Sequence, residues 1–218
     1  MARTPFLFGC LLLGTAFFHT AAWFSQTTDS QKKMIEYPSR ITMHIDNGTV
    51  EEAFVHLLSS TRFPGGVALT PSCCRARYTF EIKDLTLVEA LDYVSSYDPS
   101  YAWETSNGAI YLHPKEDIPS LLQTRIIRFV RGPDSIDGLK SELAEMPEIK
   151  AAEAKLSLHP ARVMGGLNNP APARFRIELN NVTLSEALNA LVAKHGTAIW
   201  QYGEDRSSHE FNIIFLVR

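Results

Sequence analysis

From residue 41, apolar and polar residues alternate along this chain, and apolar residues at helical spacing follow. Ile41, Met43 and Ile45 alternate with polar residues, as in a strand that buries one face. Thr49 and Glu52 then have the spacing of a capping box, in which a hydroxyl and a carboxylate satisfy the N–H groups that begin a helix. The apolar residues that follow have the spacing of one helix face: Val50, Ala53, Phe54, Leu57 and Leu58. The pattern predicts a strand and then a helix.

The same pattern predicts the element order β-α-β-β-α-β-β twice along the chain. In the first copy, strands are expected at 41–45, 67–69, 78–82, 101–105 and 109–113, and helices begin at 50 and 87. In the second copy, strands are expected at 125–130, 155–158, 175–179, 198–202 and 211–217, and helices at 135–146 and 184–192. Within the strand at 125–130, Ile127 and Phe129 are expected on one side. The predicted fold class is α+β, with helices packed on small mixed or antiparallel sheets.

An internal repeat supports this division of the chain. Residues 76–104 match residues 173–201, 97 positions later, at nine of twenty-nine positions, whereas unrelated segments would match at about two. The matching residues in the first copy are Ala76, Arg77, Glu81, Thr86, Leu87, Glu89, Ala90, Leu91 and Trp103. Trp103 and Trp200 therefore occupy equivalent strand positions and are expected to anchor the core of each copy. The first module is predicted at residues 40–116 and a second, diverged module at 124–218.

The second copy departs from the first in two places. Ser135 can cap its first helix, but Gly138 stands where a capping box needs a carboxylate. The loop at 160–172 is also much longer than its counterpart at 71–74, and loops of this length in compact domains tend to be functional or disordered. A partner-binding role is therefore predicted for one segment of the longer loop: Gly165, Gly166, Leu167, Asn168 and Asn169.

The first 22 residues have the features of a secretory signal. Arg3 precedes an apolar run at 5–18, and small residues up to Ala22 suit a signal peptidase, so cleavage is expected after Ala22. Residues 23–39 are polar and read as a linker. Two alternatives stay open, an uncleaved membrane anchor and a lipoprotein acylated at Cys10. The protein is expected in the periplasm or envelope, and it would meet a membrane only through this N-terminal segment.

Composition and motifs point away from several functions. The formal net charge of −3 leaves no basic field for a phosphate backbone, so nucleic acid is not an expected partner. The histidines lack the short spacings of a metal site, and Gly65-Gly66 lacks the Lys and Ser/Thr of a phosphate-binding loop. No catalytic residue, cofactor or metal is predicted, and the protein is not expected to be an enzyme.

Cys73 and Cys74 are adjacent, and Cα atoms only 3.8 Å apart would strain a disulfide between them. Such a ring is easily reduced and could act as a redox switch. Two free thiols, or a bond to another chain, are the alternatives.

The sequence motif Thr-Leu-x-Glu-Ala-Leu lies between a predicted strand and a predicted hairpin in both copies, and this arrangement is similar to that of a known domain family. It occurs at 86–91 and at 183–188, and this arrangement resembles the short N-terminal domain shared by bacterial secretins and signalling TonB-dependent receptors. The resemblance implies an exported, non-catalytic module that binds proteins. Members of that family continue into an outer-membrane barrel, for which Arg218 leaves no room, so membrane activity is not carried over.

The function expected from the sequence is protein-protein contact in the cell envelope, for signalling or docking, through an exposed strand edge. One alternative is a small-ligand binder with a pocket between the copies, lined by Trp103 or Trp200. Another is a thiol-based redox sensor at Cys73 and Cys74.

Overall fold

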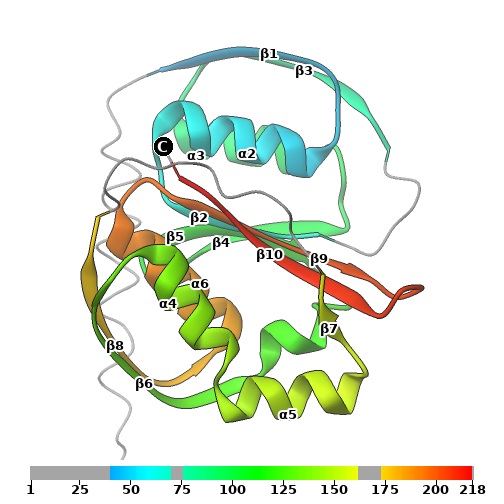
Figure 1. Cartoon of the computed structure of the whole chain (residues 1–218). Helices are drawn as coiled ribbons and strands as arrows, with labels where there is room; N and C mark the ends of the chain where they lie inside the picture. Colours follow the sequence, from blue (N-terminus) through cyan, green and yellow to red (C-terminus); the bar gives the residue numbers. More distant parts are fainter. Residues whose placement is uncertain (1–39, 70–75, 162–172, 218) are drawn as a thin grey trace, which may run out of the picture.

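The computed structural model describes residues 40–69, 76–161 and 173–217, which form a mixed α+β structure (Figure 1). The first copy contains β1 (Ile41–Gly48), α2 (Val50–Thr61), β2 (Gly65–Ala68), β3 (Tyr78–Leu85), α3 (Leu87–Ser95), β4 (Tyr101–Ser106) and β5 (Ala109–Pro114). The predicted element order of this copy is confirmed.

The second copy has one helix more than predicted. It contains a short 3₁₀ turn, η1 (Ser120–Gln123), then β6 (Arg125–Asp134), α4 (Ile136–Ala144), α5 (Pro147–Leu156), β7 (His159–Pro160), β8 (Phe175–Thr183), α6 (Leu184–His195), β9 (Ile199–Asp205) and β10 (Glu210–Leu216). The strand predicted at 155–158 is wrong, because these residues end α5 and lead out of it. Pro147 at the first helical position and the alanines that follow favour a helix there.

The side chains predicted to share one side of β6 do not do so. Phe129 is buried, but Ile127 is 71% exposed, and Ile126 takes the second buried position. Among the residues that the structure describes, β6 pairs only with β8, in a two-stranded ribbon. Isolated ribbons twist more strongly than wide sheets, so the side facing the core changes along the strand and simple alternation fails.

Local signals fix the ends of the helices. All three predicted capping boxes are present, at Thr49 with Glu52, Thr86 with Glu89, and Thr183 with Glu186. Ser135 accepts a hydrogen bond from the N–H of Gly138 without a reciprocal carboxylate, as predicted.

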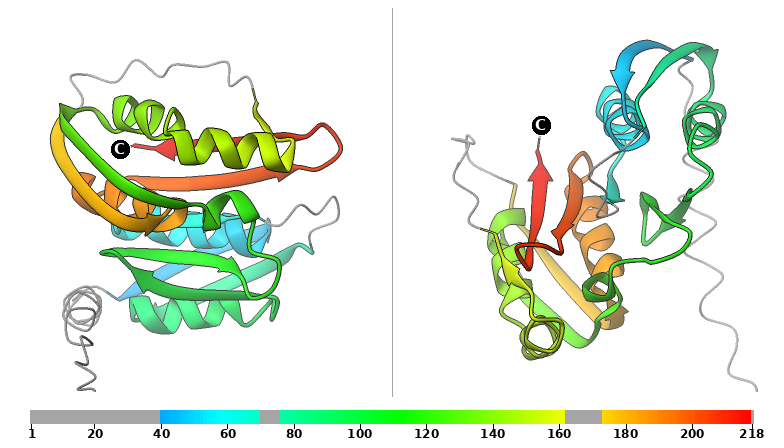
Figure 2. Two further views of the ribbon diagram at one scale, coloured as in Figure 1. Left: turned by 90° about the horizontal axis from the view of Figure 1, so that it is seen from below. Right: turned by 90° about the vertical axis from the view of Figure 1, so that its right-hand side faces the viewer.

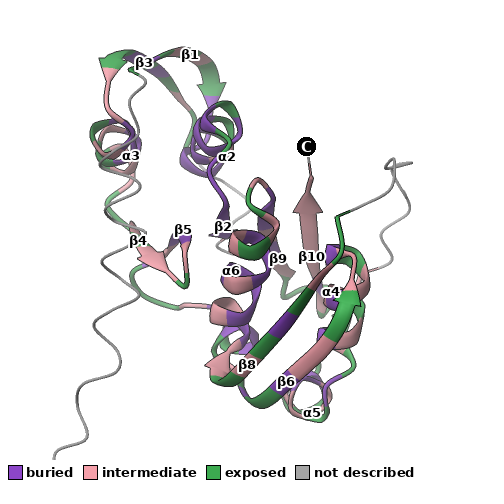
Figure 3. Cartoon of the chain, turned by 90° about the vertical axis from the view of Figure 1, so that its left-hand side faces the viewer, coloured by how far each residue is buried: buried purple, intermediate pink, exposed green. Residues whose placement is uncertain are grey.

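A six-stranded sheet joins the two copies. Its order is β4-β5-β2-β9-β10-β7, so three strands of the first copy lie beside three strands of the second. β2 pairs in parallel with β5 on one side and with β9 on the other. We call the β2–β9 pairing the seam. Figure 3 shows β2 buried along its length, as expected for a central strand.

The second copy is turned over relative to the first. β9 runs parallel to β2, whereas its equivalent β4 runs antiparallel to β5 and hence to β2. A rotation of 180° about an axis that lies in the plane of the sheet, perpendicular to the strands, reverses the strand direction. It also exchanges the face of the sheet that the helices cover. Accordingly α2 and α3 cover one face and α4 and α6 the other, with the ribbons β1–β3 and β6–β8 outermost (Figures 1 and 2).

Each sheet strand near the seam contributes to two cores. On β2, Val67 faces the core beneath α2 and α3, whereas Ala68 faces the core that contains Trp200. On β5, Ile110 and Tyr111 divide in the same way. The two copies therefore share their central sheet.

Candidate interaction site

β4 forms one edge of the central sheet. Within the described residues it pairs only with β5, through a hairpin whose turn is Asn107-Gly108, both with positive φ. A two-residue turn of this kind makes Ser106 and Ala109 a hydrogen-bonded pair. Pairs then alternate along an antiparallel ladder, so the N–H and C=O groups of Trp103 and Thr105 point away from β5. The outer side of β4 can accept another strand.

β7 forms the opposite edge, and it is blocked. The N–H groups of His159 and Ala161 donate to the carbonyls of His209 and Phe211, at 2.9 and 2.7 Å. Pro160, between them, faces outward and has no N–H to donate. Proline at such a position is a common protection of sheet edges. The two edges therefore differ, and β4 is the open one.

Trp103 stands at the middle of β4. Its side chain packs on the first core but stays half-exposed, and its Nε1 donates to Asp92 Oδ1 on α3 at 2.9 Å. Trp200 makes the equivalent bond in the second copy, from Nε1 to Asn189 Oδ1 at 2.8 Å. Trp103 and Trp200 are 97 positions apart in the sequence, and so are their acceptors Asp92 and Asn189. Trp200 is fully buried beside the seam.

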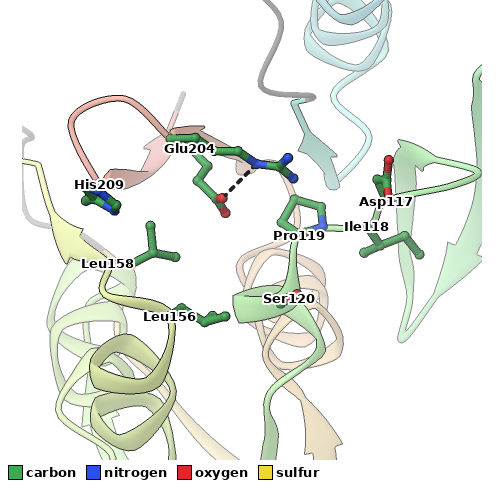
Figure 4. Close-up of a pocket in the computed structure, with 9 residues that line it drawn as sticks. Asp117, Ile118, Pro119, Ser120, Leu156, Leu158, Glu204 and His209 are labelled. Carbon is green, nitrogen blue, oxygen red and sulfur yellow. Dashed lines mark ion pairs between the residues drawn. The ribbon is translucent and has the colours of Figure 1, made fainter.

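A hollow of about 370 Å³ lies elsewhere, between the connection of the two copies and the β9–β10 turn (Figure 4). Its lining residues are Asp117, Ile118, Pro119, Ser120, Leu156, Leu158, Glu204, Arg206 and His209. Glu204, only 11% exposed, accepts a hydrogen bond from the Tyr202 hydroxyl at 2.9 Å and lies 3.6 Å from Arg206 Nε.

Tyr202 and the β9–β10 turn determine the electrostatics beside the hollow. Burial, and then the charge of Glu204, raises the pKa of Tyr202, so its hydroxyl remains a neutral donor. The hydroxyl and N–H groups of Ser207 hold the pKa of Asp205 at about 2 in the adjoining turn. Among residues 40–69, 76–161 and 173–217, no group of three or more His, Cys, Asp or Glu side chains could hold a metal ion.

Several residues singled out by the sequence lie outside the described ranges: Cys10, Ala22, Cys73, Cys74, Gly165, Gly166, Leu167, Asn168 and Asn169. The signal, redox and partner-loop assignments stay predictions. Trp103 and Trp200, by contrast, are placed, and they belong to different cores. The small-ligand alternative also stays a prediction. The seam does not follow from the predicted elements, although the uninterrupted non-polar run of β2 is typical of a central strand.

No family model, curated protein or solved structure matches this chain. In the part that the structure describes, no helix is both long enough and apolar enough to cross a membrane.

Proposed function

We propose that this protein is an exported, non-catalytic module that binds a protein partner in the periplasm or envelope. The partner would contribute an extended segment to the outer side of β4. One observation carries the proposal: among the described residues β4 pairs only with β5, and a partly buried tryptophan stands at its centre. Main-chain hydrogen bonds would supply affinity, and Trp103 would supply a side-chain contact.

Two further features support this proposal. The N-terminal segment has the pattern of a secretory signal, and export would bring the chain to the compartment where envelope proteins meet. The repeated Thr-Leu-x-Glu-Ala-Leu phrase resembles a domain class that binds proteins and carries out no catalysis.

The test uses the full chain, immobilised and exposed to an envelope extract, with bound proteins identified by mass spectrometry. Thr105→Pro removes an outward N–H while leaving the bonds to β5 intact. We expect it to reduce the capture of the specific partner at least tenfold. Thr105→Val is the matched control, because it has nearly the same shape and keeps the N–H. Equal capture by both variants would show that β4 is not the binding edge.

A further inference from the structure

The hollow beside the β9–β10 turn depends on a hairpin that is longer than its equivalent in the first copy. There the hairpin turns at Asn107, which lies 97 positions before Glu204. β4 ends at Ser106, whose equivalent is Gly203, but β9 runs on to Asp205. The extension forms one wall of the hollow, and the end of α5 and the connection between the copies form the others. The duplicated fold does not require this extension.

A largely buried carboxylate stands inside the hollow. Trp200, Tyr202 and Glu204 lie on the same face of β9, because side chains alternate along a strand. The first two are fully buried in the second core, and Glu204, at the end of the row, is only 11% exposed. Figure 4 shows its carboxylate pointing between Leu158 and Pro119. A charge in such a place is costly unless a close partner compensates it.

The contacts of Glu204 within the chain compensate this charge incompletely. Its Oε2 accepts the hydrogen of the Tyr202 hydroxyl at 2.9 Å, but that donor is neutral. Its Oε1 lies 3.6 Å from Arg206 Nε, beyond the usual N–H···O range of about 2.7–3.2 Å. The Arg206 side chain is 68% exposed, and ion pairs made by exposed groups are weak. Oε1 can therefore take a closer cation than the one that the chain supplies.

The other walls of the hollow determine what this cation could carry. Ile118 and Leu158 line it with aliphatic carbon. Among its charged lining side chains, Asp117 and Glu204 are carboxylates and Arg206 carries the opposite charge. A volume of about 370 Å³ lies at the lower end of the range for small-molecule sites. These walls suit an apolar body with a positive charge at one end.

We infer that the hollow binds an alkylammonium, which is a primary amine on a short aliphatic chain. The ammonium donates to Glu204 Oε1 in place of Arg206, whose exposed guanidinium turns into solvent, and the aliphatic chain lies along Ile118 and Leu158. An amine of this kind resembles the lysine side chain, with a pKa of about 10.4, and is charged at pH 7. The hollow is separate from the β4 edge, so this inference goes beyond the proposed function and does not depend on it.

The test is a titration of the purified full chain with n-pentylamine, followed by the NMR chemical shifts of the backbone amides. Saturable shifts are expected at residues 117–120 and 204–209, with a dissociation constant of about 1 mM, because so small a ligand makes few contacts. Pentan-1-ol and pentanoate carry a neutral and a negative head group on a similar chain. Both should bind about tenfold more weakly or not at all, since hydrogen bonds between opposite charges are the stronger ones.

Two substitutions separate the roles of Glu204 and Arg206. Glu204→Gln can still accept from Tyr202 but loses the charge, so pentylamine should bind about tenfold more weakly. Arg206→Gln removes the competing cation and should strengthen binding about threefold. Because Arg206 is exposed, this variant tests the inference even where Glu204→Gln fails to fold. Glu178→Gln and Arg128→Gln, at exposed positions of the β6–β8 ribbon, are the matched controls and should bind like wild type.

One further probe shows where the ammonium comes from. Nα-acetyl-lysine amide presents an alkylammonium on a peptide backbone. Binding at least as tight as that of pentylamine indicates that the hollow takes a lysine side chain of a protein, and much weaker binding indicates a free amine. Both results support an alkylammonium site.

Three results would overturn the inference. The first is the absence of saturable shifts at about 50 mM pentylamine, far above the expected dissociation constant. The second is equal binding of pentylamine and pentan-1-ol, which would mean that the carboxylate takes no part. The third is an Arg206→Gln variant that binds pentylamine more weakly than wild type, because Arg206 would then support the ligand instead of competing with it. None of these results affects capture of an envelope protein at β4.

Discussion

Trp103 and Trp200 occupy equivalent positions in the two copies, yet their surroundings differ. Each donates its Nε1 hydrogen to an Asx side chain on the helix that precedes it, but among the described residues a further strand covers Trp200 and none covers Trp103. The acceptor differs accordingly: Asp92 is exposed and charged, whereas Asn189 is fully buried and neutral. Burying a charge costs far more than burying an amide. The same hydrogen bond is therefore present in both copies, but its acceptor is a carboxylate where the site is exposed and a neutral amide where the site is buried.

The largest expected difference between the copies comes from removing each indole. Trp200→Ala leaves a cavity between α6 and the seam and should lower the free energy of unfolding by about 4 kcal/mol. Trp103→Ala removes a side chain that is already half-exposed and should lower it by about 1–2 kcal/mol. Urea unfolding of both variants measures the difference, and equal losses would contradict the role assigned to the seam.

Exchanging the acceptors should give the next largest effect. Asn189→Asp places a carboxylate in a fully buried position and should destabilise the protein by about 3 kcal/mol at pH 7. The reciprocal variant, Asp92→Asn, keeps the bond at the surface and should change stability by less than about 0.5 kcal/mol. Thermal denaturation of the two variants is the measurement. An Asn189→Asp variant as stable as wild type would mean that water reaches this site.

The helix caps distinguish the copies less strongly. Thr183→Ala breaks the capping box of α6 and should cost about 1 kcal/mol, as should Thr86→Ala in α3. Ser135→Ala removes a cap without a reciprocal carboxylate and should cost about half as much. Chemical denaturation of the three variants tests this order. A Ser135→Ala variant that loses the most stability would show that α4 depends on its cap more than α6 does.

The smallest expected effect depends on pH. His195 in α6 is the equivalent of Asp98, and burial lowers its pKa below 6.5. The unfolded chain then binds more protons than the folded one between the lowered pKa and 6.5, so stability should fall as the pH drops through that window. Stability of wild type and His195→Gln at pH 7.5 and 5.5 measures this contribution. If the two proteins lose equal stability on acidification, His195 makes no such contribution.

Elements determined by adjacent residues could be predicted from the sequence. The Thr86–Glu89 box and the Asn107-Gly108 turn act over four residues or fewer, and both were predicted where the structure has them. α5 was missed although Pro147 and the alanines after it are a readable helix signal. Ile127 was misplaced because strict alternation holds poorly in a twisted ribbon.

The seam could not be predicted in the same way. Pairing between β2 and β9 joins residues far apart in the sequence, and no local pattern specifies which of several edges meet. The repeat predicted that Trp103 and Trp200 are equivalent, but their unequal exposure follows from the pairing alone. The open edge of β4 could therefore be identified only from the structure.

Pairing of Gly65–Ala68 with β9 has a consequence for synthesis on the ribosome. At 5–20 residues per second, translation from residue 69 to residue 205 takes roughly 7–27 s. If the first copy folds as it emerges from the ribosome or from an export channel, β2 stays unpaired on its β9 side until β9 has also emerged. A chaperone that shields exposed strands would have its clearest target here, and a translational pause after residue 69 would lengthen the exposure.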